Sequence, residues 1–119
     1  SDVYKRQALL DPIAPAENVV LSSHGIVPAE GIETVEYLTP VPEFRLSRSH
    51  LAPCRESHLG IEGPFIVLVT EGTVTLTSRE CPEGLSVSAG HAAWVGAWED
   101  RPTIATGENS ATVFIARVP

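Results

Sequence analysis

The sequence has few of the residues that would bring it to a nucleic acid or to an anionic membrane. It contains eight Lys and Arg against fifteen Asp and Glu, which gives a formal net charge of −7. Binding to nucleic-acid phosphates depends on clustered basic side chains, and so does binding to an anionic membrane surface. The longest apolar run, Phe65–Val69, is too short to cross a bilayer as a helix. We therefore expect no nucleic acid and no membrane as a partner.

Cysteine is scarce as well. Cys54 and Cys81 are the two cysteines of the chain, and neither belongs to a C-x-x-C pair. We predict two free thiols in a reducing compartment, and hence a cytoplasmic protein. A disulfide is the alternative, and it would require secretion, for which no signal peptide is visible.

Long amphipathic helical patterns are missing, whereas turn-forming residues are plentiful. Ten prolines and nine glycines occur in 119 residues. Val, Thr and Ile are common, and these residues favour strands. A chain of this length forms one domain at most. The composition therefore predicts a small all-β protein.

The chain divides into three parts by composition. Residues 1–7, SDVYKRQ, resemble a translated sequencing-adapter tail, and we expect them to be non-native. Residues 8–40 are Pro-rich and weakly patterned, and we interpret them as a connector from a missing upstream domain. Residues 41–119 are expected to form the β domain itself.

The stretch GPFIVLVTEGTVTL, residues 63–76, has the clearest β pattern. Its continuously apolar part, Phe65–Val69, predicts a strand buried on both faces. A Glu71-Gly72 turn and an alternating segment, Thr73–Thr77, complete a predicted hairpin. Further strands are expected over 34–38, 43–51, 84–90, 92–97, 101–106 and 110–118. Six or seven strands at this spacing after residue 43 are typical of a sandwich or barrel.

The order of these segments resembles a cupin jelly roll, in which three histidines and one glutamate hold a metal ion. Two loose sequence motifs carry those ligands. When the first motif is aligned on Gly72, its glutamate position is Phe65. Its two histidine positions are His58 and Gly60 with a four-residue spacer, or Leu59 and Ile61 with a three-residue spacer. When the second motif is aligned on Gly90, its later positions are Gly96, Trp98, Arg101 and Ala105. His58 is therefore the one residue that matches any of the four metal-ligand positions.

A single imidazole cannot hold a divalent ion against water. We therefore predict that this chain contains no metal site, no cofactor site and no catalytic residue. Phe65 is expected to fill the barrel interior with hydrocarbon, as side chains do in small barrels. The histidines outside the motifs, His24, His50 and His91, are expected in loops or on the surface.

The two tryptophans and one charged run are the remaining candidates for a binding role. Trp94 alternates with Val95 and is expected to pack in or against the barrel. Trp98 could stack on a sugar, although a packing role is favoured. We interpret Glu99–Arg101 as a solvated turn, because neighbouring carboxylates in a loop point apart.

Four segments together resemble one family in one order. They are TPVPEFRLSR (39–48), GPFIVLVTEGTVTL (63–76), LSVSAGHAAWVGA (85–97) and ATVFIARV (111–118). The set is similar to the C-terminal domain of bacterial type I mannose-6-phosphate isomerase, and the resemblance covers residues 38–119. The matching positions are Pro42-Glu43-Phe44, Gly63-Pro64, Glu71-Gly72, Gly90 and Trp94-Val95. Gly96 departs from the family's usual V-P-A segment.

The resemblance implies a parent enzyme that interconverts mannose 6-phosphate and fructose 6-phosphate. In that family zinc lies in the preceding domain, held by a Gln-x-His pair, a glutamate and a later histidine. None of these motifs occurs in this sequence. The resemblance therefore implies a non-catalytic, cupin-like C-terminal module that packs on a missing catalytic domain. That domain would bind the zinc and the sugar phosphate, and this chain alone is expected to be inactive.

Two other functions remain open on sequence. One is a free-standing carbohydrate-binding module that stacks a sugar on Trp94 or Trp98. The other is a small metal-dependent cupin enzyme with displaced ligands. It would need at least three of the four histidines, His24, His50, His58 and His91, around a single point.

Overall fold

The computed structural model describes residues 25–39, 44–60, 64–97, 100 and 102–117. These residues form nine strands and no helix. The strands are β1 (Ile32–Tyr37), β2 (Arg45–Leu51), β3 (Glu56–His58), β4 (Phe65–Glu71), β5 (Thr73–Thr77), β6 (Leu85–Ser88), β7 (Ala92–Val95), β8 (Thr103–Thr106) and β9 (Ala111–Arg117). The prediction of an all-β protein is confirmed.

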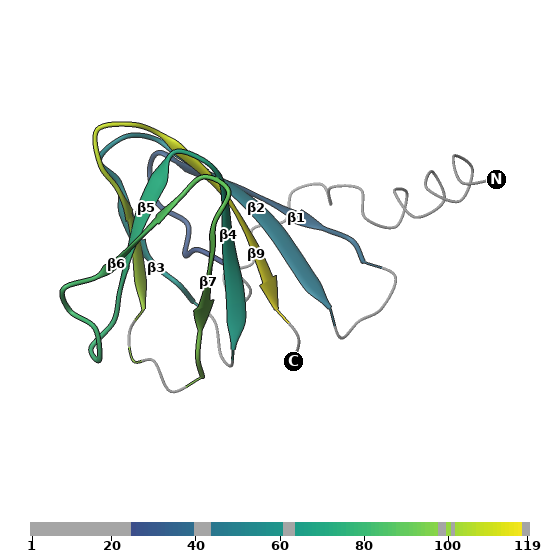
Figure 1. Ribbon diagram of the computed structural model, residues 1–119. Helices are drawn as coiled ribbons and strands as arrows, with labels where there is room; N and C mark the ends of the chain where they lie inside the picture. Colours follow the sequence, from purple (N-terminus) through teal and green to yellow (C-terminus); the bar gives the residue numbers. More distant parts are fainter. Residues whose placement is uncertain (1–24, 40–43, 61–63, 98–99, 101, 118–119) are drawn as a thin grey trace.

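The strands form two antiparallel sheets that face each other (Figure 1). One sheet has the order β1-β2-β9-β4-β7, and the other has the order β3-β8-β5-β6. Inward side chains alternate with outward ones along each strand, as two packed sheets require. The buried core comprises Ile26, Ile32, Leu51, Leu59, Phe65, Val67, Val69, Val74, Leu76, Val87, Ala93, Val95, Ile104, Ala111, Val113 and Ile115. The result is a cupin-like β-sandwich.

Strand β4 is not buried on both faces, so that prediction was wrong. Phe65, Val67 and Val69 point inward, whereas Ile66 and Leu68 are 43% and 40% exposed. The strand lies inside its sheet, between β9 and β7, but the described residues place no second layer on the outer side. The outer positions are apolar although solvent reaches them.

The turn at Gly72 does not close a hairpin, which corrects a second prediction. Strand β4 pairs with β7 and β9, while β5 pairs with β6 and β8. A bulge between Val69 and Glu71 bends the end of β4, and bulges sharpen the local twist of a strand. Gly72 then takes a positive φ of 77°. The chain thus turns a corner from one sheet into the other.

A second corner lies against the first one. Gly90, with a φ of 86°, connects β6 in one sheet to β7 in the other. The Gly90 N–H donates to the Val69 carbonyl at 2.8 Å, and the Ala89 N–H donates to the Gly72 carbonyl at 2.9 Å. The two corners therefore fix each other by backbone hydrogen bonds.

The described N-terminal part belongs to the sandwich. Strand β1 pairs with β2 from Ile32 to Tyr37, and Ile26 forms a bridge with Leu59. The short strand β3 was not expected from sequence, and it pairs with β8. The suspected non-native residues 1–7, and residues 8–24 of the expected connector 8–40, lie outside the described residues. In the part of the chain that is described, no helix is long and apolar enough to cross a membrane.

Candidate functional site

The sandwich interior is filled with hydrocarbon where the cupin pattern predicts a metal ligand. Phe65 is 2% exposed and lies opposite Val95 on β7. Its inward neighbours on the strand, Val67 and Val69, are fully buried. Among the described ranges, no group of three or more His, Cys, Asp or Glu could hold a metal ion. The expectation that Phe65 fills the interior is confirmed.

The three described histidines are exposed and lie on three different elements. His50 is on the outer side of β2, His58 is on β3, and His91 lies between β6 and β7. His50 Nδ1 is 3.1 Å from Thr112 Oγ1 on β9. These three residues do not converge, and His24 lies outside the described residues.

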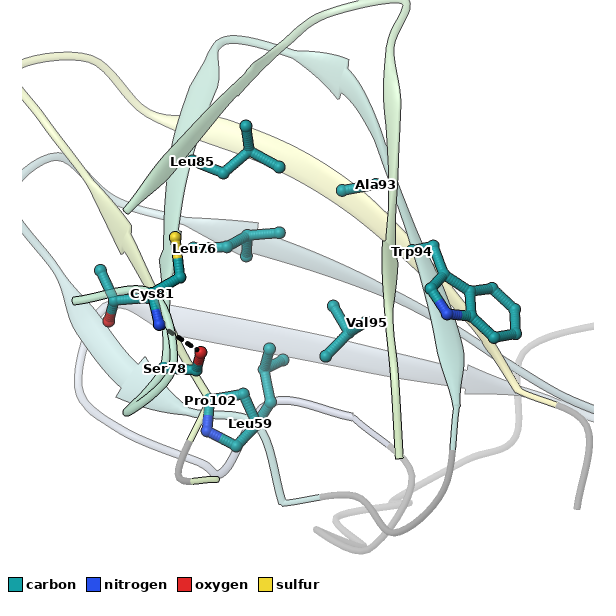
Figure 2. Close-up of a pocket in the computed structure, with 10 residues that line it drawn as sticks. Leu59, Leu76, Ser78, Cys81, Leu85, Ala93, Trp94, Val95 and Pro102 are labelled. Carbon is teal, nitrogen blue, oxygen red and sulfur yellow. Dashed lines mark hydrogen bonds between the residues drawn. The ribbon is translucent and has the colours of Figure 1, made fainter. Parts of the chain in front are cut away.

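A small open cavity lies between the two sheets, next to the strands β6 and β7 (Figure 2). Its volume is about 90 Å³. The lining residues are Leu59, Leu76, Thr77, Ser78, Cys81, Leu85, Ala93, Trp94, Val95 and Pro102. Sites for whole small molecules usually measure at least ~300 Å³. This cavity is therefore large enough for a short apolar group and too small for a whole sugar.

Polar contacts join the two loops beside this cavity. Arg79 Nε lies 3.3 Å from Asp100 Oδ2, and the Asp100 N–H donates to Glu80 Oε1 at 2.8 Å. The hydrogen bond from the Asp100 backbone lowers the pKa of Glu80 below its ordinary value, and the Arg79 charge adds a smaller effect. Asp100 therefore forms specific contacts rather than standing in a merely solvated turn. Glu99 and Arg101 lie outside the described residues.

The two cysteines are both free thiols. Cys81 lines the cavity together with Leu76 and Leu85 (Figure 2). Its N–H donates to Ser78 Oγ at 3.2 Å. Cys54 is exposed in the turn before β3, with a positive φ of 57°. Sequence reasoning missed the cavity because its lining comes from separate strands and loops without any shared motif.

Trp94 does not pack in or against the sandwich, so that expectation was wrong. Its side chain is 60% exposed, whereas its neighbour Val95 is 7% exposed. Figure 2 shows the indole ring on the far side of β7, pointing away from the cavity. The alternation was recognised correctly, but the sequence did not say which of these two apolar residues points inward. Trp98 lies outside the described residues.

Comparison with known proteins identifies the fold. No protein-family model matches the chain, and no curated protein matches it. A cupin superfamily protein from Desulfitobacterium hafniense shares 14% identity over 90% of this chain and 94% of its own, with a TM-score of 0.63. A cupin 2 conserved barrel domain protein from Salinispora arenicola shares 16% identity over 90% and 87%, with a TM-score of 0.62.

A third similar structure is a polyketide cyclase from Streptomyces resistomycificus. It shares 13% identity over 91% of this chain and 75% of its own, with a TM-score of 0.65. Identities this low establish the fold and carry no activity from one protein to another. The chain therefore has a cupin fold.

Proposed function

We propose that this chain is the non-catalytic C-terminal β domain of a zinc-dependent mannose-6-phosphate isomerase. The observation that carries the proposal is the burial of Phe65, at 2% exposure, where the cupin pattern places a ligating glutamate. The segments that resemble the isomerase family include β2, β4, β7 and β9 of the five-stranded sheet, together with β5 and β6 of the other sheet. The zinc and the sugar phosphate belong to the upstream domain in this proposal.

The chemistry of the interior supports a module without its own metal. Zinc binds nitrogen, sulfur and oxygen ligands, and catalytic sites use three protein ligands. Phe65 and Val95 face each other across β4 and β7, and Val67 faces Ala93 on the same side. Each of these side chains is buried hydrocarbon. The free thiols of Cys54 and Cys81 fit the reducing cytoplasm that we propose as the location.

The test measures zinc and isomerase activity in the purified chain. We expect zinc content far below one equivalent by mass spectrometry of metals, and no turnover of mannose 6-phosphate in a coupled assay. Stoichiometric zinc or measurable turnover would contradict the proposal. The upstream reading frame provides an independent check, because it should encode a Gln-x-His pair followed by a glutamate.

A carbohydrate-binding module is the second candidate, and the exposure of Trp94 favours it. An indole ring that is 60% exposed offers a flat apolar surface to a sugar ring. Titration with mannose and with fructose 6-phosphate, followed by tryptophan fluorescence, tests this function. Saturable quenching that is lost in Trp94→Ser would support the sugar-binding module. A flat titration would leave the isomerase domain as the assignment.

A further inference from the structure

The outer side of the five-stranded sheet carries an apolar row across its whole width. The pairing places Tyr37 of β1 opposite Leu46 of β2, which is opposite Ala116 of β9. Ala116 is opposite Ile66 of β4, and Ile66 is opposite Trp94 of β7. Residues opposite each other in antiparallel strands share one face of the sheet. One residue from each strand thus contributes to a continuous apolar line.

A second row runs beside the first one. It contains Phe114 of β9 opposite Leu68 of β4, and Leu68 is opposite Ala92 of β7. The Phe114 ring stacks on the Tyr37 ring of the first row, with centroids 6.5 Å apart. Arg48 is the charged member of this row. We call Tyr37, Leu46, Ile66, Leu68, Trp94 and Phe114 the outer apolar face.

A polar row borders the outer apolar face on one side. Thr112 Oγ1 donates to Glu71 Oε1 at 2.9 Å, and His50 Nδ1 lies 3.1 Å from the same hydroxyl. Glu33 lies opposite His50 and extends this row to β1. An apolar centre with a hydrogen-bonded polar border is the organisation of a protein–protein contact. Large exposed apolar patches of this kind mark interaction surfaces.

We infer that the outer apolar face docks on the domain that precedes this module in the same polypeptide. The inference rests on the proposed function, because it requires an upstream domain. The inference specifies which surface of this chain makes the contact, and Trp94 and Leu68 are the side chains that become covered. Arg48 is the cation that the preceding domain would have to match with an acceptor.

The size of the face favours a tethered domain over a second copy of this chain. Five strands at ~4.8 Å spacing and two rows ~7 Å apart give roughly 300–500 Å² on one side. Stable contacts between separate proteins bury about 800 Å² on each partner. Contacts between domains of one chain extend down to about 600 Å² in total, counting both sides. The outer apolar face fits the second class.

The length of the chain before the sandwich is compatible with this contact. Residues 1–7 are expected to be non-native, so 17 residues, 8–24, would join an upstream domain to Gly25, and at about 3.3 Å per residue they reach at most ~56 Å. The described part measures 48 Å in its longest dimension. A Cβ added to Gly25 would lie 3.1 Å from Ser47 Oγ, which is buried on the inner side of β2, so the chain would pass the edge of the sheet to reach the outer apolar face. A tether of this length gives an effective concentration near the millimolar range.

Hydroxyl-radical footprinting with mass spectrometry tests the contact at single side chains. It compares this chain with the longer polypeptide expressed from the natural start codon of the same reading frame. We expect oxidation of Trp94 and Leu68 to be several-fold slower in the longer polypeptide. Leu85 is an internal control, because it is 53% exposed on β6 of the other sheet. Equal oxidation of Trp94 in both polypeptides would overturn the inference.

A matched pair of variants separates docking from general stability. In the longer polypeptide, Leu68→Lys should restore fast oxidation of Trp94, whereas Leu85→Lys should leave Trp94 protected. Sedimentation of this chain alone tests whether a second copy of the chain covers the outer apolar face instead. A dimer that Leu68→Lys dissociates would assign the face to a second copy and contradict the inference.

The inference and the proposed function fail in distinguishable ways. If the upstream domain lacks the zinc ligands but Trp94 is protected, docking stands and the isomerase assignment falls. If the upstream domain binds zinc but Trp94 is equally exposed, the isomerase assignment stands and docking falls. A start codon directly before this chain would contradict both.

Discussion

Gly72 lies so close to the backbone of Ser110 that no side chain fits between them. A Cβ added to Gly72 would collide with the Ser110 carbonyl oxygen and would lie 3.0 Å from Ala111 Cα. Gly90, at the neighbouring corner, has a similar positive φ, yet an added Cβ would meet nothing within 4 Å. The two corners therefore share a backbone conformation and differ in the space beside it.

This difference predicts unequal effects of alanine at the two corners. Gly90→Ala should cost about 1 kcal/mol, because only the left-handed backbone conformation is penalised. Gly72→Ala should cost clearly more, about 3 kcal/mol or above, because the collision is with backbone that cannot rotate away. Urea unfolding followed by circular dichroism measures both. Equal costs at the two positions would show that the corner at Gly72 relaxes freely.

The opposite faces of β4 give a second prediction. Phe65→Ala should lower the free energy of unfolding by about 3–5 kcal/mol, because it removes a buried ring and leaves a cavity. Ile66→Ala should cost about 1 kcal/mol or less, since the side chain is 43% exposed. Denaturant unfolding of the two variants tests the pair. A larger cost for Ile66→Ala would mean that the register of β4 is wrong.

The strands with a clear alternating pattern were predictable from sequence. Residues 43–51 and 73–77 alternate, and they form β2 and β5. The continuous apolar run at Phe65–Val69 was misleading, because Ile66 and Leu68 are apolar although they point outward and are exposed. Local composition does not distinguish a strand buried on both faces from one with exposed apolar side chains on its outer face.

The pairing partners could not be predicted from local sequence. Glu71-Gly72 is a turn signal both in a hairpin and in a corner between two sheets. Which of the two forms depends on the pairing of β4 with β9 and β7, which come later in the chain. Strand β3 has only three residues, and its place depends on hydrogen bonding to β8. Long-range contacts, rather than local propensity, decided these features.

The interior was easier to predict than the cavity or the outer face. Motif spacing alone gave Phe65 its inward position, which the structure confirms. The cavity beside Cys81 combines residues from both sheets, and no spacing pattern links them. Trp94 and Val95 are both apolar, so alternation left their orientation undetermined.

A third prediction concerns the pH dependence of the contact between Glu80 and Asp100. The pKa of Glu80 is lowered in the folded protein, chiefly because its carboxylate accepts the Asp100 N–H. Because the pKa of Glu80 is lower in the folded than in the unfolded protein, its ionised carboxylate stabilises the fold at pH values above the unfolded pKa. This contribution is lost as the pH falls through the folded pKa. The difference in Tm between the protein and Glu80→Gln should therefore shrink on acidification through this window.

The titration of Glu80 can also be followed directly by NMR of its carboxyl carbon. We expect a midpoint below that of glutamate in an unstructured peptide. Because the side chain is fully exposed, the effect on total stability should be small and should weaken with added salt. A midpoint at or above the peptide value would contradict the hydrogen bond to Asp100.

The polar row beside the outer apolar face predicts the tautomer of His50. The single Thr112 hydroxyl proton is donated to Glu71 Oε1 at 2.9 Å, so Thr112 Oγ1 must act as an acceptor toward His50 Nδ1 at 3.1 Å. Neutral His50 should therefore carry its proton on Nδ1. Long-range nitrogen–proton NMR spectra identify the protonated nitrogen, and Thr112→Val should shift the population toward the Nε2–H form. His58, which makes no such threonine contact within the described part of the chain, provides the comparison. An Nε2–H majority at His50 would show that Thr112 is not its acceptor.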